Sequence, residues 1–450
     1  MPRTLAVVRP TTDAEALRPA LDFLTATLGL PDAGPEALLV RVEDDQQLGP
    51  LAEDIAAKLA RVSAAAQRDE HGRMRPTGLL HDPVVDRLAQ HFLQNLRARA
   101  LSEGVALLRK WPWRHARPFA VALSHDVDLP RKWRARSVAS YALKRRDLSG
   151  VSARLRAAED PWWTYDKIRA IEARAGVGST FFFAAGGRHP EDPKYQIENG
   201  QMPALVRELA AAGSEIGLHG SYLASEDAEL LTKEKRRFER ATGISVDTHR
   251  QHYLRFHAES PERLKEAGFR YDSSLGTEFS LGFLDGVSVP HSLGDVLELP
   301  VSVMDTCFQE ASDVNRAYAT EASRRAALGQ VLSNVREVHG LIVVDWHQNY
   351  FDEGDYPGFR QLYEWILDTT GDADRGGVRD IAQWWEARAA VQILRVGGGW
   401  RLEGGNLTSG LTIAASNVDL ESDDPHLVAK ADEEVLYTFT GKGPWGLRLT

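Results

Sequence analysis

Cysteine and long apolar runs are both scarce in this sequence. Cys307 is the single cysteine among 450 residues, which excludes an internal disulfide and a zinc site built from thiolates, so any metal would be held by histidine and carboxylate. No run of about 18 apolar residues occurs, and we therefore expect no transmembrane segment. The N-terminal residues lack the apolar core and the small-residue cleavage site of a signal peptide, so we expect a cytoplasmic protein.

An excess of positive charge is also missing. Lysine and arginine number 54 against 64 aspartate and glutamate residues, which gives a formal net charge of −10. A nucleic-acid-binding protein would carry a basic surface, so we expect no nucleic-acid partner. The apolar fraction of 43% and the charged fraction of 26% are those of an ordinary globular protein. At this length two or three domains are expected, and the sequence assigns no oligomeric state.

Three regions of the sequence differ in composition and in the pattern of their apolar residues. Residues 1–115 have the pattern of an accessory α/β region, and residues 392–450 are glycine-rich with short alternating apolar runs, which predicts a small all-β domain. Residues 116–391 alternate strand and helix patterns, with seven strand candidates: VALSHDVD, GSTFFFAA, SEIGLHGS, DTHRQHYL, FRYDSSL, VLELPVSV and LIVVDWHQ. This alternation favours a barrel with helices outside. The predicted fold class is therefore α/β, a distorted (β/α)7 barrel with an N-terminal α/β region and a C-terminal all-β appendage.

Ionisable side chains stand at the carboxyl ends of most of these strands. The stretch VALSHDVDLP ends in Asp126 and Asp128, which alternate onto one face and would repel unless a cation or a proton lies between them. The later strands end in further polar groups: His219, Arg250, His252, Asp272 and His347. Because barrel strands end at one mouth, these groups would converge there. The alternative is that polar residues are simply common at strand ends. This alternative is plausible for any single residue, but it explains the whole set poorly.

Five of these segments occur in the order of a known motif set. LSHDVD, EIGLHGSY, RQHYLRF, YDSSLG and VVDWH resemble the five motifs of the NodB-type polysaccharide deacetylases, carbohydrate esterase family 4. GVGSTFFF resembles the second strand of that family and DIAQWWEAR its closing helix, so the resemblance covers about residues 115–391. Members have a distorted barrel and remove acetyl groups from N-acetylated sugars with a divalent metal, usually zinc. The resemblance implies a hydrolase of non-peptide carbon–nitrogen bonds that acts on an acetylated sugar or glycan.

The resemblance also implies roles for the matching residues. In members with an Asp-x-Asp first motif, the first carboxylate is the base and the second binds metal. Asp126 would then be the base that acts on a metal-bound water, and Asp128 a metal ligand. His219 matches the first metal histidine. Arg250 matches the arginine that holds the catalytic aspartate by a charge-assisted bond and keeps it ionised.

The remaining implied roles concern the leaving group and the substrate. His347 matches the general acid that protonates the leaving amine, and Asp272 would orient its imidazole and keep it cationic. The backbone N–H of Tyr253 would help to hold the oxyanion. We expect Tyr253, Ser221 and Trp346 to contact the substrate.

One position departs from the family pattern. Members usually carry a second metal histidine four residues after the first, where this sequence has Leu223. Asp128 and His219 alone are fewer than the three protein ligands of typical catalytic zinc sites. His252 is the first candidate for the missing ligand, because in an extended segment it shares a face with Arg250; a contact with substrate is the alternative for this residue. The expected cofactor is a divalent metal, zinc before cobalt, nickel or manganese.

Two further segments bear on partners. Residues 131–156 carry many arginines and lysines, which usually means a solvated helix face. The functional hypothesis is that this segment receives the phosphate of a lipid-linked or nucleotide-linked sugar, or makes a peripheral contact with an anionic membrane. Trp162 and Trp163 are adjacent, and they are either core residues or a stacking platform for a sugar.

Two alternatives to acetyl-sugar hydrolysis stay open. The same fold could hydrolyse a small non-peptide amide, since the chain is expected in the cytoplasm. The chain could also be a non-catalytic glycan-binding homologue that has lost part of its metal site at Leu223. The paired base and acid, Asp126 and His347, favour the enzyme, because a binding protein has no need of both.

Overall fold

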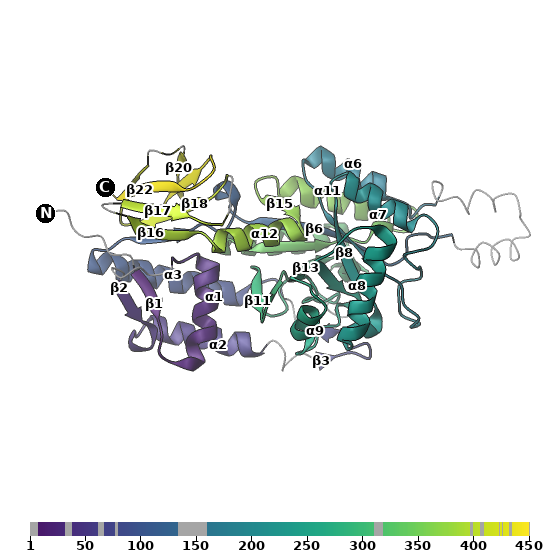
Figure 1. The fold of residues 1–450 in the computed structure, drawn as a ribbon, viewed down its shortest axis with the longest axis horizontal. Helices are drawn as coiled ribbons and strands as arrows, with labels where there is room; N and C mark the ends of the chain where they lie inside the picture. The colour runs from purple at the N-terminus through teal and green to yellow at the C-terminus, as the bar shows by residue number, and fades with distance from the viewer. Residues whose placement is uncertain are drawn as a thin grey trace, which may run out of the picture.

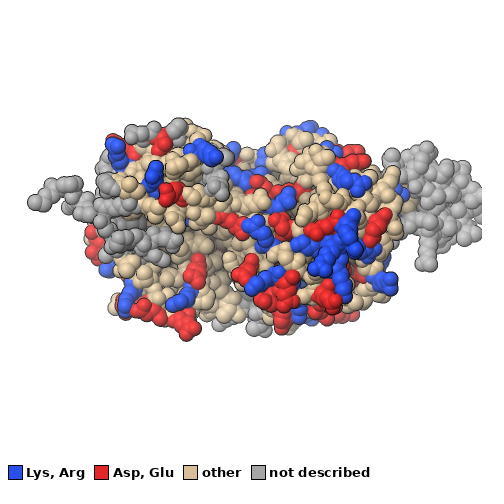
Figure 2. All heavy atoms as spheres, viewed as in Figure 1, with Lys and Arg blue, Asp and Glu red and all other residues tan. Residues whose placement is uncertain are grey.

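The computed structural model describes residues 8–31, 38–61, 67–76, 80–133, 160–309, 318–396, 399–405, 409–422, 424, 426–431 and 434–449. The molecule is elongated, with the N-terminal helices and the C-terminal sheets together at one end and the central α/β region at the other (Figure 1). On the face shown in Figure 2, basic and acidic side chains are interspersed. None of the described helices is both long enough and apolar enough to cross a membrane.

Three helices form most of the N-terminal region: α1 (Arg18–Leu28), α2 (Leu48–Arg61) and α3 (Val84–Glu103). Two short strands pair in parallel, β1 (Val8–Thr11) and β2 (Leu38–Arg41), and a hairpin is formed by β3 (Gln67–Arg68) and β4 (Met74–Arg75). Buried residues of α3 recur at helical spacing, which gives the helix one face toward the core. The same helix contacts the barrel, because Val85 N donates to Gly286 O at 2.9 Å.

A ten-stranded sheet forms the centre of the molecule. Nine strands follow one another in the order β11 (His291–Leu293), β12 (Val296–Glu298), β10 (Tyr271–Asp272), β9 (Thr248–Gln251), β8 (Glu215–Gly220), β7 (Thr180–Ala184), β6 (Ala120–Val127), β14 (Leu341–Asp345) and β13 (Val301–Met304). The tenth, β15 (Asp374–Gly377), also pairs with β6. Only β11 runs antiparallel to its neighbour among these described strands.

Pro300 divides one predicted strand between two parts of this curled sheet. The predicted strand VLELPVSV is divided at Leu299–Pro300 into β12 and β13, because proline has no N–H to give to a ladder. β12 pairs with β10 and β13 with β14, so one short stretch of chain joins the two ends of the row of parallel strands. All seven predicted segments lie in this sheet, and the count rises to ten through the division at Pro300 and the additional strands β11 and β15.

Helices cover the outside of the barrel (Figure 1). They are α6 (Tyr165–Ala175), α7 (Met202–Ala211), α8 (Ala228–Thr242), α9 (Ser260–Glu266), α10 (Glu321–Val338), α11 (Phe359–Thr369) and α12 (Val378–Ala389). Every residue of β6 and β7 is buried, which is typical of parallel strands covered on both faces. The chemistry at the strand ends is therefore held on a rigid, fully packed frame.

The C-terminal region consists of two four-stranded antiparallel sheets. One contains β16 (Gln392–Val396), β17 (Gly399–Glu403), β22 (Trp445–Leu449) and β19 (Leu420–Glu421). The other contains β20 (His426–Ala431), β21 (Glu434–Phe439), β18 (Thr412–Ser416) and β5 (Leu107–Lys110). β5 comes from the region that the sequence-based division placed in residues 1–115. Arg109 of β5 forms a buried ion pair with Glu434, so the two end regions share one core.

Candidate metal centre

A cavity of about 390 Å³ opens at the carboxyl ends of the central strands. Six of the ten predicted site residues line it: Asp126, Asp128, His219, His252, Tyr253 and His347. Asp126 is the penultimate residue of β6, Asp128 follows that strand directly, and His219 is near the end of β8. The convergence expected from a barrel mouth is therefore observed for these residues.

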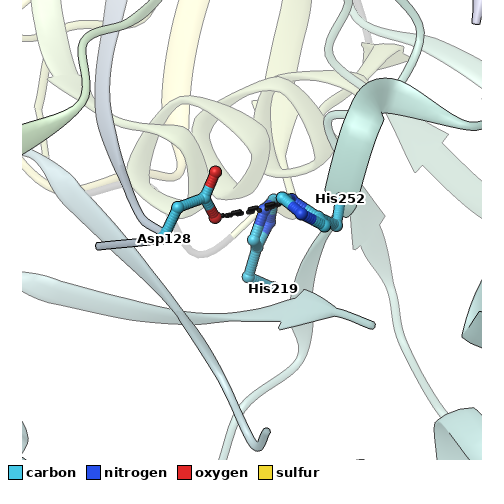
Figure 3. Close-up of side chains that lie close together, drawn as sticks. All are labelled: Asp128, His219 and His252. Carbon is cyan, nitrogen blue, oxygen red and sulfur yellow. Dashed lines mark hydrogen bonds and ion pairs between the residues drawn. The ribbon is translucent and has the colours of Figure 1, made fainter. Parts of the chain in front are cut away.

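Three possible metal ligands among the residues that line this cavity approach one another (Figure 3). Nε2 of His219 lies 3.0 Å from Nδ1 of His252. Oδ1 of Asp128 lies 3.3 Å from the first of these nitrogens and 3.4 Å from the second. Zinc holds nitrogen and oxygen ligands at about 2.0–2.2 Å in a tetrahedron, which places neighbouring ligand atoms ~3.3 Å apart. The three separations fit three corners of such a site.

The hydrogen bonds of the two histidines turn the correct nitrogens toward Asp128. Nδ1 of His219 donates to the carbonyl oxygen of Arg250 at 3.0 Å, and Nε2 of His252 donates to that of Glu191 at 2.8 Å. Each bond fixes a tautomer whose other nitrogen is free to accept a metal, as is usual for metal-binding histidines. Burial lowers the pKa of His252, which favours the neutral, ligating form of the ring.

Asp128 provides an independent sign that a cation fits here. Its Oδ1 atom is buried and makes no hydrogen bond to another described residue, so its neighbours there are the two ligand nitrogens of His219 and His252, and a buried carboxylate oxygen is costly without a counter-charge. Burial alone would raise the pKa of Asp128, but the neighbouring His252 and His219 lower it well below its ordinary value. The side chains present therefore fit a divalent metal, with the fourth corner left for water or substrate.

A left-handed turn positions His252. β9 ends at Gln251, and His252 begins a short turn in which Tyr253 and Leu254 have φ values of 62° and 47°. Positive φ is uncommon for residues other than glycine, and such strain persists where packing over-determines it, often at functional sites. Leu223, at the position of the expected family histidine, is 47% exposed. The sequence-based expectation of an extended segment at His252 was wrong in detail, but the imidazole still reaches the cluster.

Arg250 holds Asp126 from below the cavity. The arginine is fully buried, and its Nη1 donates to Oδ1 of Asp126 at 3.0 Å and to Oγ of Ser124 at 2.7 Å. Burial alone would raise the pKa of Asp126, but the charges of His219, Arg250 and His347 lower it. Asp126 is therefore ionised at neutral pH and able to accept a proton.

His347 stands across the cavity with Asp305 behind it. Oδ1 of Asp305 accepts from Nδ1 of His347 at 2.9 Å, and Oδ2 accepts from the backbone N–H of the same histidine at 2.6 Å. Burial alone would lower the pKa of His347, but Asp305 and Asp345 raise it well above its ordinary value. The imidazole is therefore a cation whose Nε2 faces Asp128, 3.7 Å from Oδ2. Such a group can donate a proton.

The predicted role of Asp272 was wrong. Its Oδ1 accepts from Nδ1 of His249 at 2.7 Å and from the hydroxyl of Ser274 at 2.7 Å, while Asp305 takes the place behind His347. Asp305 directly follows β13, and β13 pairs with β14, the strand that ends two residues before His347. The sequence did contain a signal, a carboxylate just past the apolar run VSVM, but it could not show that this run pairs with β14.

Two predicted substrate contacts were also wrong. Trp346 is fully buried and packs against Phe308, Phe359 and Tyr363. Ser221 is buried, its backbone N–H donates to Glu234 at 3.0 Å, and neither residue lines the cavity. Strand alternation explains the first error, because side chains on either side of an inward-pointing residue point outward.

Asp345 is a functional candidate that sequence reasoning missed. Its Oδ1 lies 3.2 Å from Nη1 of Arg250 and accepts from the backbone N–H of Asp126 at 3.3 Å. Burial and the charge of Asp126 raise its pKa to about 7. Alternation in VVDWH places Asp345 on the same side as His347, so the signal was present in the same motif that was used for the acid.

Other predictions about partners are tested only in part. Most of the basic segment 131–156 lies outside the described residues, which resume at Asp160. Trp162 is half-buried and its Nε1 donates to Asp355 at 2.8 Å. Neither Trp162 nor Trp163 is among the residues that line the cavity. A sugar-stacking role for this pair therefore has no support from the cavity.

Comparison with known proteins gives a likeness of fold. No family model matches the sequence, and no curated protein matches it. Among solved structures, a proposed polysaccharide deacetylase from Mycobacterium smegmatis is 22% identical, with 62% of this chain and 94% of that chain covered and a TM-score of 0.43. A family 4 acetyl xylan esterase from Clostridium thermocellum, in complex with a cobalt ion, is 13% identical, with 58% and 89% covered and a TM-score of 0.30.

A third solved structure is a family 4 carbohydrate esterase pseudoenzyme from Bacillus anthracis. It is 13% identical, with 58% of this chain and 64% of that chain covered and a TM-score of 0.28. All three identities lie below 25% and all three TM-scores lie below 0.5, so these likenesses carry no conclusion about this chain. The function of this chain has to be argued from its own side chains.

Proposed function

We propose that the chain is a metal-dependent hydrolase that removes an acetyl group from an N-acetylated sugar or polysaccharide precursor. One observation carries the proposal. Three ligand atoms with the spacing of a tetrahedral metal site lie between a carboxylate held by Arg250 and an imidazole held by Asp305. A base, a metal site and an acid in one cavity are the parts that amide hydrolysis requires.

Asp128, His219 and His252 would hold the metal, and their nitrogen and oxygen donors suit zinc. A divalent cation there supplies Lewis-acid polarisation of the acetyl carbonyl and a lowered pKa for a water molecule. Asp126 then accepts a proton from the attacking water, since Arg250 keeps the carboxylate ionised and fixed in place. This assignment agrees with the roles implied by the resemblance to the NodB-type deacetylases.

His347 is the proposed general acid. Its raised pKa keeps Nε2 protonated at neutral pH, and that proton passes to the leaving amine when the carbon–nitrogen bond breaks. Asp305 acts through His347 as a positioning residue and stabilises the cationic imidazole. The backbone N–H of Tyr253 is the proposed hydrogen-bond donor to the developing oxyanion.

The size of the cavity is also compatible with a second candidate function, the hydrolysis of a small non-peptide amide. Its volume of about 390 Å³ is near the lower end of ligand pockets, and a small non-peptide amide would fit it as well as one acetamido sugar unit. The closeness of His252 to Asp128 and His219 supports the catalytic proposal over the non-catalytic alternative, which rests on Leu223 standing where the family pattern has a histidine. Cytoplasmic location and a lipid-linked or nucleotide-linked substrate stay predictions.

A substrate panel tests the proposed function. Wild-type protein with added zinc is assayed for acetate release from N-acetylglucosamine oligosaccharides and from acetanilide, beside Asp126→Asn and the surface control Leu223→Ala. We expect release from the sugars by the wild type and Leu223→Ala, and a loss of at least about 100-fold in Asp126→Asn. Release from acetanilide alone would favour the small-amide function. Equal rates in all three proteins would refute a role for Asp126.

A further inference from the structure

The N-terminal region, outside the barrel, supplies one wall of the cavity. The hairpin of β3 and β4 lies against the barrel, apart from α1 and α2 (Figure 1). Arg73, which precedes β4, lines the cavity together with Tyr253 and Glu278. Its guanidinium lies over the ring of Tyr253, 5.2 Å from the centroid. Tyr253 directly follows the proposed metal ligand His252, so Arg73 contacts the residue next to a proposed ligand.

The hairpin is fixed to the barrel by packing and hydrogen bonds. Met74 is buried in a small cluster with Phe256 and Leu275. Its carbonyl oxygen accepts from the hydroxyl of Thr277 at 2.8 Å. Further along the chain, Phe283 N donates to the carbonyl oxygen of Leu80 at 2.8 Å. These contacts give the cavity wall a defined position.

The orientation of Arg73 is set by two carboxylates. Nε donates to Oδ2 of Asp69 at 2.6 Å, and Nη1 forms an ion pair with Glu278. Oδ1 of Asp69 also accepts from the backbone N–H groups of His71 and Arg73, each at 2.9 Å, which closes the hairpin turn. The side chain is only 14% exposed. A guanidinium held in this way loses little rotamer freedom when it binds a ligand.

The charges around Arg73 indicate what it would bind. Asp69 and Glu278 together carry more negative charge than the arginine carries positive charge, so a phosphate or carboxylate of a substrate would meet net repulsion. Within the described part of the chain, the hydrogen bonds and ion pairs of Arg73 use Nε and Nη1, which leaves Nη2 as a donor. The neighbouring carboxylate of Glu278 is an acceptor. A donor beside an acceptor suits a neutral hydroxyl group.

We propose that Arg73 and Glu278 form a sugar subsite that binds hydroxyl groups of the ring carrying the acetamido group. The inference rests on the proposed function and deepens it. It makes the N-terminal region part of the substrate site and selects a neutral, hydroxyl-bearing sugar over an anionic one at this position. Arg73 is thereby a specificity-determining residue, supplied from outside the barrel motifs.

Arg73 and Arg75 form a matched pair for the test. Both belong to the same hairpin, but Arg75 is exposed and stacks on Phe279, 4.4 Å from the ring centroid, without lining the cavity. Deacetylation of N,N′-diacetylchitobiose is measured for the wild type, Arg73→Ala, Arg73→Lys and Arg75→Ala. We expect KM to rise about tenfold or more in both Arg73 variants, because a charge-assisted hydrogen bond is lost, and to change less than twofold in Arg75→Ala.

Binding is measured separately from turnover in an Asp126→Asn background. Calorimetric titration with the same disaccharide should show at least a tenfold weaker Kd when Arg73→Ala is added, with the zinc content unchanged and the protein folded at the temperature of the titration. A further comparison uses the 6-phosphate of N-acetylglucosamine, which should bind no better than the unphosphorylated sugar. Arg73→Lys guards against misfolding of the hairpin, since it keeps the charge and the apolar stem.

The outcomes separate this inference from the proposed function. If the wild type deacetylates the disaccharide but Arg73→Ala and Arg75→Ala behave alike, the subsite is refuted and the hydrolase stands. Tighter binding of the phosphorylated sugar would also refute it, because an anion site would then be present. If the wild type neither binds nor deacetylates any sugar, the proposed function fails and the subsite with it.

Discussion

Replacing Asp305 by asparagine tests the assignment of the acid side of the site. Asp305 makes two hydrogen bonds to His347, one to Nδ1 and one to the backbone N–H. Asparagine has nearly the same shape, so it removes the negative charge and one acceptor while the local packing is kept. The imidazole then loses the partner that fixes its tautomer and stabilises its cationic form.

The expected loss follows from what His347 does. General acid catalysis by a positioned histidine contributes about 10²–10⁴-fold, and misplacing its tautomer forfeits most of that. We therefore expect kcat of Asp305→Asn to fall about 100- to 10,000-fold, which corresponds to about 3–5 kcal/mol of activation free energy. Because Asp305 raises the pKa of His347, the alkaline limb of the pH profile should also move to lower pH in the variant.

The assay is acetate release from N,N′-diacetylchitobiose across pH 5 to 9, with zinc content measured on the same samples. Asp272→Asn is the matched control, since it removes a buried aspartate charge from β10 of the same sheet, where the partner is His249. We expect Asp272→Asn to keep kcat within about threefold and Asp305→Asn to keep its zinc. Equal losses of kcat in the two variants would refute the assignment of Asp305 as the partner of His347.

Three further predictions concern the metal site, the pH dependence of stability and the shared end sheet. In His252→Ala we expect the zinc Kd to rise at least about 100-fold, by competition with a chromophoric chelator, while Leu223→Ala keeps the wild-type value. Burial raises the pKa of Asp86 from 3.8 to about 7, so the folded state binds this proton more tightly and the free energy of unfolding falls as pH rises from about 4 to about 7. Asp86→Asn cannot titrate and removes that loss. Urea denaturation should therefore show the free energy of unfolding of Asp86→Asn, relative to wild type, rising by up to about 4 kcal/mol from about pH 4 to about pH 7. A difference that stays constant with pH would contradict the raised pKa of Asp86. Glu434→Gln leaves Arg109 buried without its charge partner, and we expect urea denaturation to show a loss of about 3 kcal/mol, whereas no change would mean that the two end regions are coupled by other contacts.

The strands could be predicted from the sequence because they depend on local patterns, whereas the ligand roles of Asp128 and His219 were implied by the resemblance to the NodB-type motifs. Apolar runs placed β6, β8 and β14, and alternation placed Asp126 on the face of Ser124, where Arg250 contacts both. The same reasoning reached His252 as a ligand candidate. These inferences need only the direction of a side chain and the end of a strand.

The acid side was harder because it depends on which strands are neighbours. Asp272 and Asp305 both follow apolar strand segments, and the sequence offered no reason to prefer the one beside β14. The segment VLELPVSV is divided at Pro300, and its second half, β13, pairs with β14, which is a non-local pairing that the sequence pattern does not show. Trp346 was misplaced as well, although alternation in VVDWH puts it on the face opposite His347.

The N-terminal contribution to the cavity could not be predicted at all. The hairpin that carries Arg73 is short, and its strands are two residues each, too short for a periodic signal. Its contact with Tyr253 joins residues 180 positions apart in the chain. The position of this arginine depends on tertiary contacts, the packing of Met74 against the barrel and the ion pair of Arg73 with Glu278.

The metal content of purified protein, wild type beside Asp128→Asn, tests the central claim most directly. Asp128 contributes the oxygen that lies 3.3 Å and 3.4 Å from the two histidine nitrogens, and asparagine replaces its charge with a neutral amide. After reconstitution with zinc and desalting, the account predicts close to one ion per chain in the wild type and a large loss in the variant. If the wild type holds no metal, or if the variant holds as much as the wild type, the three side chains do not form the proposed centre.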